Sequence, residues 1–163
     1  MPPMGEYNTS QICLNGYLVN EYARTMPLHN SPHCTKCGAE TITACKDCQT
    51  AIRGAYHSPG VITAFVKRDI PAFCQNCGKA FPWTASALEA ARFLADETDS
   101  LSPAEREQLK ATLADLVQDT PRTALATTRF KKFMLKAGKE TAQAFRDIFV
   151  DIVSDSVKKS IWG

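Results

Sequence analysis

The sequence lacks any long hydrophobic segment, since its apolar runs extend over only a few residues and cannot span a bilayer. Its first residues, from Met1 to Ser10, also lack the basic stretch followed by an apolar stretch that marks a secretory signal. We therefore expect a cytoplasmic protein without a membrane span.

Common catalytic signatures are absent as well. The chain has no His-Glu-x-x-His, no nucleoside-triphosphate loop and no Ser-His-Asp candidate. It also lacks the His-x-Glu and Pro-Cys-x-x-Cys pattern of zinc deaminases. We expect no enzymatic activity. A zinc enzyme is the less favoured alternative, because thiolate ligands donate charge and make the metal a weak Lewis acid.

Cysteine and glycine are unevenly distributed along the chain. All seven cysteines lie between Cys13 and Cys77, and the only glycines after Thr84 are Gly138 and Gly163. The composition changes at Pro82-Trp83. We predict an α+β fold, with a double zinc-ribbon domain of short antiparallel hairpins over residues 1–83 and a helical domain or arm over residues 84–163.

Three Cys-x-x-Cys units indicate metal binding, namely Cys34-Thr35-Lys36-Cys37, Cys45-Lys46-Asp47-Cys48 and Cys74-Gln75-Asn76-Cys77. Two intervening residues form a tight turn that brings both sulfurs to about 2.3 Å from one zinc ion. Glycine follows the second cysteine in two of the units and permits a left-handed backbone there. Redox dithiols are the alternative, but no βαβ pattern surrounds these units.

Two such units complete one tetrahedral site, and the spacing favours Cys45, Cys48, Cys74 and Cys77. A second site then takes Cys13, Cys34 and Cys37. Its fourth ligand is open between His33, His29 and water, so two zinc ions are expected in total. A rival pairing joins Cys34, Cys37, Cys45 and Cys48, which would leave the last pair incomplete.

Secondary-structure signals differ between the halves. Asn15-Gly16 predicts a hairpin turn, and Val61–Val66 reads as a strand. A helix is expected over residues 84–96, and Ser102-Pro103 with Glu105 predicts the capped start of the next one. A third helix starts after Thr120-Pro121 and ends or kinks at Gly138. Apolar periodicity predicts a single amphipathic helix over residues 142–162.

Charge narrows the choice of partners. The formal net charge is +2, and two zinc–thiolate sites would make it slightly negative, so the protein is not globally basic. Residues 120–139 nevertheless carry six basic side chains and no acid. Arg129, Lys132, Lys136 and Lys139 are predicted to share one helical face, which is a possible nucleic-acid surface. Pairing with the acidic residues 84–119 is the alternative.

The apolar face of the last helix needs a partner, either within the chain, in a second copy or in another protein. We therefore interpret the chain as a zinc-binding module that mediates macromolecular interaction. A protein partner or self-association is expected, and nucleic acid is the alternative partner.

Several motifs together resemble an uncharacterised bacterial family, the domain of unknown function numbered twenty-three twenty-one. The resemblance rests on the three cysteine pairs, Ile12-Cys13-Leu14-Asn15-Gly16, Ile52-Arg53-Gly54, Phe81-Pro82-Trp83, Asp119-Thr120-Pro121-Arg122-Thr123 and Arg129-Phe130-Lys131-Lys132-Phe133. It implies a zinc-ribbon protein with a helical tail and no established activity. In the family pattern a histidine lies four residues after the first cysteine, where this chain has Tyr17. If that histidine is a ligand in relatives, the first site is altered here.

Overall fold

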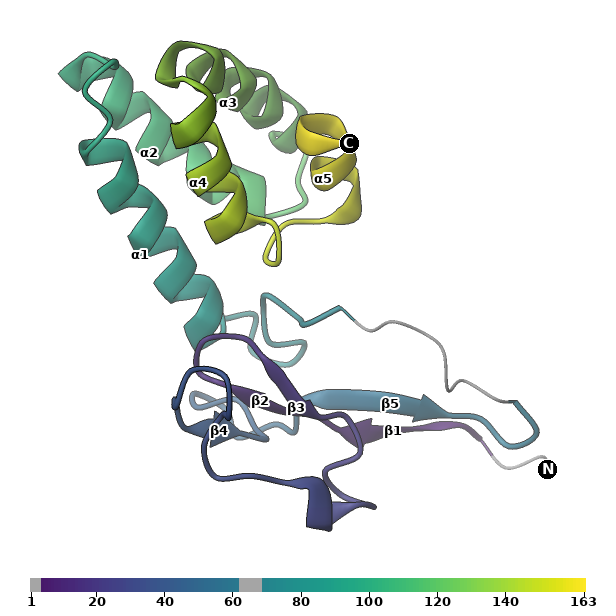
Figure 1. The fold of residues 1–163 in the computed structure, drawn as a ribbon. Helices are drawn as coiled ribbons and strands as arrows, with labels where there is room; N and C mark the ends of the chain where they lie inside the picture. Colours follow the sequence, from purple (N-terminus) through teal and green to yellow (C-terminus); the bar gives the residue numbers. More distant parts are fainter. Residues whose placement is uncertain (1–3, 62–68) are drawn as a thin grey trace. The chain divides into compact units, whose positions relative to one another are not determined.

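The computed structural model describes residues 4–61 and 69–163 (Figure 1). The chain forms two compact units, Met1–Trp83 and Thr84–Gly163. Short antiparallel strands make up the first part and five α-helices the second, so the predicted α+β class is confirmed. The strand predicted at Val61–Val66 falls, apart from Val61, outside the described residues.

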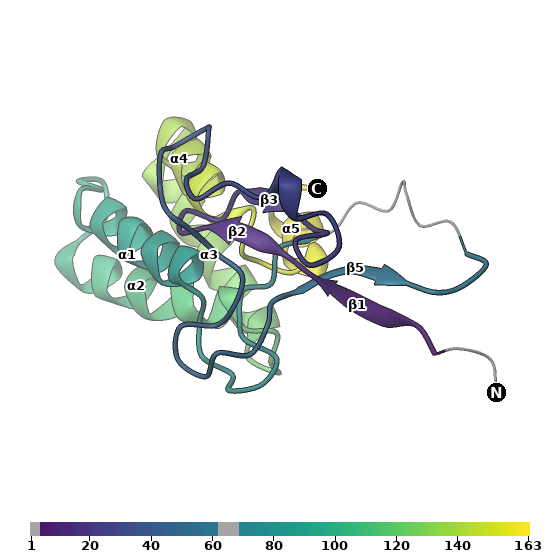
Figure 2. The same ribbon diagram turned by 90° about the horizontal axis from the view of Figure 1, so that it is seen from below.

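Two small sheets form the first unit. Strand β1 (Glu6–Thr9) pairs antiparallel with β5 (Arg53–His57), as the two arrows in Figure 2 show. In the other sheet, β2 (Gln11–Cys13) lies between β3 (Leu18–Asn20) and β4 (Thr41–Ile42). The predicted hairpin therefore joins β2 to β3.

The apolar core of this unit is small. Ile12, Ile52, Phe81 and Trp83 are each at most 4% exposed. The rings of Phe81 and Trp83 stack with centroids 4.7 Å apart, and the Trp83 indole N–H donates to the Pro71 carbonyl at 2.8 Å. Gly16 has φ +89°, and a Cβ there would lie 3.0 Å from the Trp83 Cβ. Glycine is therefore required both by the hairpin turn and by the close approach of this tryptophan.

The helices begin with α1 (Pro82–Asp96), whose first turn starts with proline as helix N-termini favour. The next helix, α2 (Pro103–Val117), has the predicted capping box. The Glu105 N–H donates to the Ser102 hydroxyl at 3.2 Å, and the Ser102 N–H donates to the Glu105 carboxylate at 2.8 Å. Helix α3 (Thr123–Ala137) ends at Gly138, where φ is +97°.

The single helix predicted over residues 142–162 is wrong, because two helices occupy this region. Helix α4 (Lys139–Phe149) ends before a five-residue break, and α5 (Asp155–Trp162) follows. The Ser154 hydroxyl accepts a hydrogen bond from the Val157 N–H at 3.4 Å and so starts a new helix. Apolar spacing alone did not reveal this cap, because the predicted core side chains on both sides of the break are still turned inward.

Helix α3 is central to the packing of the second unit and contacts α2, α4 and α5. The Phe130 side chain is fully buried and meets Phe145 of α4 edge to face, with centroids 5.8 Å apart. The same ring meets Trp162 of α5 at 6.2 Å. One aromatic residue of α3 therefore holds both of the later helices.

Within the part of the chain that the structure describes, no helix combines the length and the apolar character needed to cross a bilayer.

Candidate metal centres

Four sulfurs converge in the first unit, those of Cys45, Cys48, Cys74 and Cys77, all within 4.8 Å of one another. The Sγ atoms of Cys45 and Cys77 are 3.7 Å apart, and those of Cys48 and Cys74 are 3.6 Å apart. Zn–S bonds of 2.3 Å in a tetrahedron place sulfurs about 3.8 Å apart, whereas a disulfide places them about 2.05 Å apart. The spacing therefore fits a metal-binding thiolate set, and all seven cysteines are free.

The three Cys-x-x-Cys turns, which we call knuckles, share one backbone geometry. In each, the N–H of the residue after the second cysteine donates to the carbonyl of the first cysteine, at 2.8–2.9 Å. An isolated β-bridge then closes the turn. Backbone N–H groups also point at sulfur, as where Asn76 donates to the Cys74 Sγ at 3.4 Å. Such donors offset the negative charge of a thiolate.

The residue after the second cysteine is left-handed in every knuckle. Gly38 and Gly78 both have φ +75°. In the remaining knuckle, Cys45–Cys48, this position is Gln49, with φ +62°. A side chain in this region costs about 1–2 kcal/mol. Sequence reasoning identified the glycines but not that a glutamine takes the same conformation.

We expect Gln49→Gly to raise the stability of the first unit by about 0.5–1 kcal/mol, because glycine relieves the left-handed strain. Gln75→Gly is the matched control, since Gln75 is also an exposed knuckle glutamine with one side-chain bond to a backbone carbonyl, but it lacks a positive φ. Gln75→Gly should lower the stability of the first unit by a similar amount, because glycine there adds entropy to the unfolded chain without relieving strain. Thermal unfolding of the zinc-loaded variants measures both, and equal effects of the two substitutions would contradict the strain.

Side chains around one of the four sulfurs, that of Cys48, favour its thiolate form. The side chains of Thr50 and Asn76 hydrogen-bond to the sulfur of Cys48 and lower its pKa to about 6. The Thr50 Oγ1 lies 3.3 Å from this sulfur. A thiolate already present at neutral pH loses no proton on metal binding, which favours binding. Sequence reasoning missed both residues, because no spacing rule marks them.

The second group of sulfurs belongs to Cys13, Cys34 and Cys37, again within 4.8 Å of one another. The Sγ atoms of Cys13 and Cys37 are 3.7 Å apart. The Cys13 sulfur also accepts the Tyr17 N–H at 3.3 Å. A backbone N–H at Ala39 and the Asn15 side chain lower the pKa of Cys37 to about 7. The rival grouping of the Cys34 and Cys45 knuckles is not formed.

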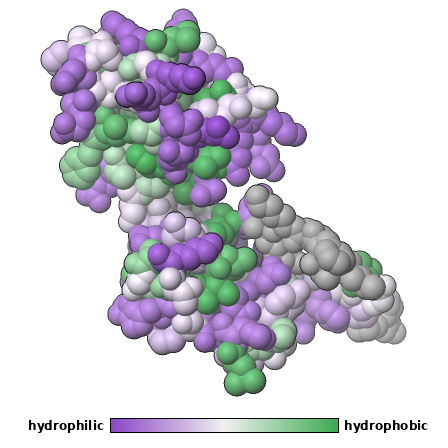
Figure 3. All heavy atoms as spheres, viewed as in Figure 1, coloured by the Kyte–Doolittle hydropathy of each residue, from purple (hydrophilic) through white to green (hydrophobic). Residues whose placement is uncertain are grey.

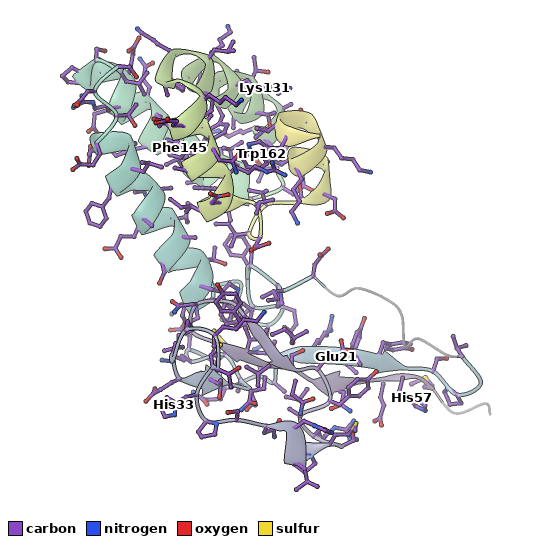
Figure 4. The ribbon with its side chains drawn as sticks, viewed as in Figure 1. Glu21, His33, His57, Lys131, Phe145 and Trp162 are labelled. Carbon is purple, nitrogen blue, oxygen red and sulfur yellow. The ribbon has the colours of Figure 1, made fainter. Side chains whose placement is uncertain are left out.

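Both histidines considered as fourth ligand lie outside this three-sulfur cluster. His33 is exposed and its backbone pairs with Glu40, and His29 is exposed at the end of the 3₁₀ helix η1 (Pro27–His29). Figure 4 shows the His33 side chain at the outside of its loop. The Tyr17 ring instead has the Lys36 ammonium 5.1 Å from its centroid. Three protein ligands thus come together, without a fourth among the described residues.

Comparison with known families places this chain in a bacterial family. A family model described as an uncharacterized protein conserved in bacteria, DUF2321, matches residues 6–161. The chain belongs to this family. The match spans nearly the whole chain and confirms the resemblance noted from the sequence. No curated protein and no solved structure matches the chain.

The basic face predicted for this DUF2321 protein is only partly formed. Arg129, Lys132 and Lys136 lie on α3, but Gly138 ends that helix and Lys139 belongs to α4. The continuous face through Lys139 is therefore wrong, because a left-handed glycine changes the chain direction. Lys136 forms an ion pair with Glu105 of the acidic segment, as the alternative interpretation expected.

Proposed function

We propose that this DUF2321 protein is a zinc-binding interaction module without catalytic activity, in which zinc stabilises the first unit and the helical unit contributes a docking surface. The observation that carries the zinc assignment is the convergence of four free cysteine sulfurs at spacings that suit a tetrahedral ion. The expected content is two zinc ions per chain, measured by mass spectrometry of the native protein. Absence of any bound metal would contradict the proposal.

A groove in the helical unit supports the interaction role. Its volume is about 520 Å³, and it is lined by Met134, Leu135, Ala142, Ile161 and Trp162 with Lys131 and Lys139. Figure 4 labels Lys131 on α3 and Trp162 on α5. Hydrophilic side chains cover most of the face of this unit seen in Figure 3, with apolar side chains in small groups between them. A groove of this size suits the apolar side chains of one partner helix.

Charge selects the partner that suits this groove. Neither Lys131 nor Lys139 forms an ion pair with any described residue, and both lie among apolar side chains. An acidic amphipathic helix of another protein would bury its apolar side chains in the groove and place carboxylates near the two ammonium groups. We therefore propose such a helix as the occupant.

Leu135→Glu should weaken the binding of a synthetic acidic amphipathic peptide by at least about tenfold, or 1.4 kcal/mol. Leu135 is 87% exposed, so the substitution should not unfold the helices. Leu125→Glu is the matched control, because Leu125 is an exposed leucine of the same helix outside the groove. Tryptophan fluorescence measures peptide binding, because Trp162 lines the groove and the other tryptophan, Trp83, does not. No fluorescence response, or equal weakening by both variants, would contradict this docking site.

Nucleic-acid binding is a second candidate, favoured by Arg129 and Lys132. Both line a shallow cavity with Phe133, and neither has an ion-pair partner in the described part of the chain. Because only two free cations remain on this face, we expect a weak interaction whose affinity for single-stranded DNA falls with salt at a logarithmic slope of about −1.4. A salt titration with single-stranded DNA measures it. Binding that is absent at low salt, or unchanged in Arg129→Glu, would exclude this candidate.

A further inference from the structure

The two cysteine clusters differ in the number of ligands that the chain supplies. The cluster that contains Cys45 and Cys74 has four sulfurs, whereas the cluster of Cys13, Cys34 and Cys37 has three. No histidine, aspartate or glutamate of the described residues joins these three, and residues 1–3 and 62–68 contain none of these residue types. The three-sulfur cluster is therefore one protein ligand short of a tetrahedral zinc site.

Only one side of this cluster is open to solvent. Cys13 is 0% exposed and Cys34 is 6% exposed, whereas Cys37 is exposed. The hairpin of β2 and β3 holds Cys13 rigidly, since the Cys13 N–H donates to the Tyr17 carbonyl at 3.0 Å and Gly16 donates back to Cys13 at 2.9 Å. A further ligand can therefore reach the cluster from the side of Cys37.

The surroundings of the open side favour an anion. Lys36 is the residue before Cys37, its ammonium lies over the Tyr17 ring, and the Lys36 N–H donates to the Cys34 sulfur at 3.4 Å. Zinc with three thiolates carries a charge of only −1, and a fourth thiolate would give the −2 of the complete cluster. A nearby cation and backbone donors offset this charge, as around other thiolate ligands.

From these observations we infer that the cluster of Cys13, Cys34 and Cys37 binds an ion whose fourth ligand is a thiolate from another molecule. This inference rests on the proposed zinc function. The incoming thiol releases its proton to solvent, and its sulfur binds the metal. A second copy of the chain is unsuited as donor, because all seven cysteines already belong to the two clusters. The donor is a small thiol or a cysteine of a partner protein.

The test uses the full chain loaded with cobalt(II), whose visible spectrum depends on the number and type of ligands. N-acetylcysteine is added as the small thiol, and a short cysteine-containing peptide is added in a parallel titration. We expect about half of the cobalt spectrum to change and the change to saturate at one thiol per chain. Tighter binding of the peptide by tenfold or more identifies a protein donor, and equal binding identifies a small thiol.

Substitutions at Tyr17 provide the matched pair for this test. Tyr17 adjoins both Cys13 and Lys36, so Tyr17→His should supply the missing ligand from within the chain and abolish the response to thiol. Tyr17→Phe keeps an aromatic ring without a ligand atom and should respond like the wild type. Loss of the response in both variants would overturn the inference.

Other outcomes separate this inference from the proposed function. Two cobalt ions with no response to either thiol overturn the inference, and a response restored by His33→Ala would identify His33 as the fourth ligand. The inference is also overturned if the cobalt spectrum changes with protein concentration and sedimentation shows dimers. That result would indicate a histidine from a second copy as the fourth ligand. One ion bound to the four-sulfur cluster alone rejects the inference and leaves the zinc function intact. No bound cobalt rejects both.

Discussion

Replacing Cys74 by serine is expected to unfold the first unit and to leave the helical unit folded. Cys74 is 3% exposed, and its sulfur is one of the four in the complete cluster and lies 3.6 Å from that of Cys48. Structural zinc contributes about 10–16 kcal/mol to the folding of small metal domains. This is comparable to or larger than the total stability of most single domains, which is about 5–15 kcal/mol.

The strands of the first unit cannot replace this contribution. Among the described residues they are two to five residues long, and the core between them consists of only a few large side chains. Small β units of this kind depend on metals or disulfides for stability. Loss of one thiolate should therefore remove the near-ultraviolet dichroism of Trp83 and at least half of the bound zinc. The far-ultraviolet signal of the helices should persist, and a strong chelator should have the same effect on the wild type.

Lys46→Ala is the matched control for Cys74→Ser. Lys46 is an exposed residue between Cys45 and Cys48, and its side chain takes no part in the cluster. Zinc content and near-ultraviolet dichroism should be unchanged. If Cys74→Ser kept both signals, zinc would not be what holds this unit together.

Phe130→Ala is expected to destabilise the helical unit and to leave zinc binding by the first unit unchanged. The Phe130 ring is fully buried and contacts Phe145 and Trp162, so its removal leaves a cavity at the junction of α3, α4 and α5. Large-to-small changes of this kind cost about 3–5 kcal/mol. A unit of this size has a stability of about 4–12 kcal/mol. The substitution should therefore remove much of the stability of the helical unit.

Urea unfolding followed by far-ultraviolet dichroism measures this loss. Zinc content should be unchanged, since no ligand lies beyond residue 83. Leu135→Ala is the control, because this leucine is 87% exposed and should shift stability by no more than about 0.5 kcal/mol. A loss of zinc in Phe130→Ala, or a shift below about 1 kcal/mol, would contradict the separate roles of the two units.

Features that depend on residues close together in the sequence could be predicted from the sequence. The capping box at Ser102 and Glu105 and the hairpin at Asn15-Gly16 follow from interactions within four residues, and both are confirmed. The break between α4 and α5 could not be predicted from periodicity. Phe145, Phe149, Val153 and Val157 are four residues apart and buried, so the spacing of one long helix continues across a segment that is not helical.

Contacts between residues far apart in the sequence could not be predicted. The ion pair of Lys136 with Glu105 joins α3 to α2, and only the packing of these helices brings the two side chains together. The same holds for Asn76 and Cys48, which lie in different knuckles. No local rule gives such partners, because their distance depends on the folded chain and not on sequence separation.

The strand β4 connects the two clusters. It pairs with β2, which carries Cys13, and three residues after it the chain reaches Cys45 of the other cluster. An ion at either cluster therefore helps to order the strand that positions the other, and the second ion meets a lower entropic cost than the first. At limiting metal, a population of this protein should divide into empty and doubly filled molecules, with few molecules holding a single ion.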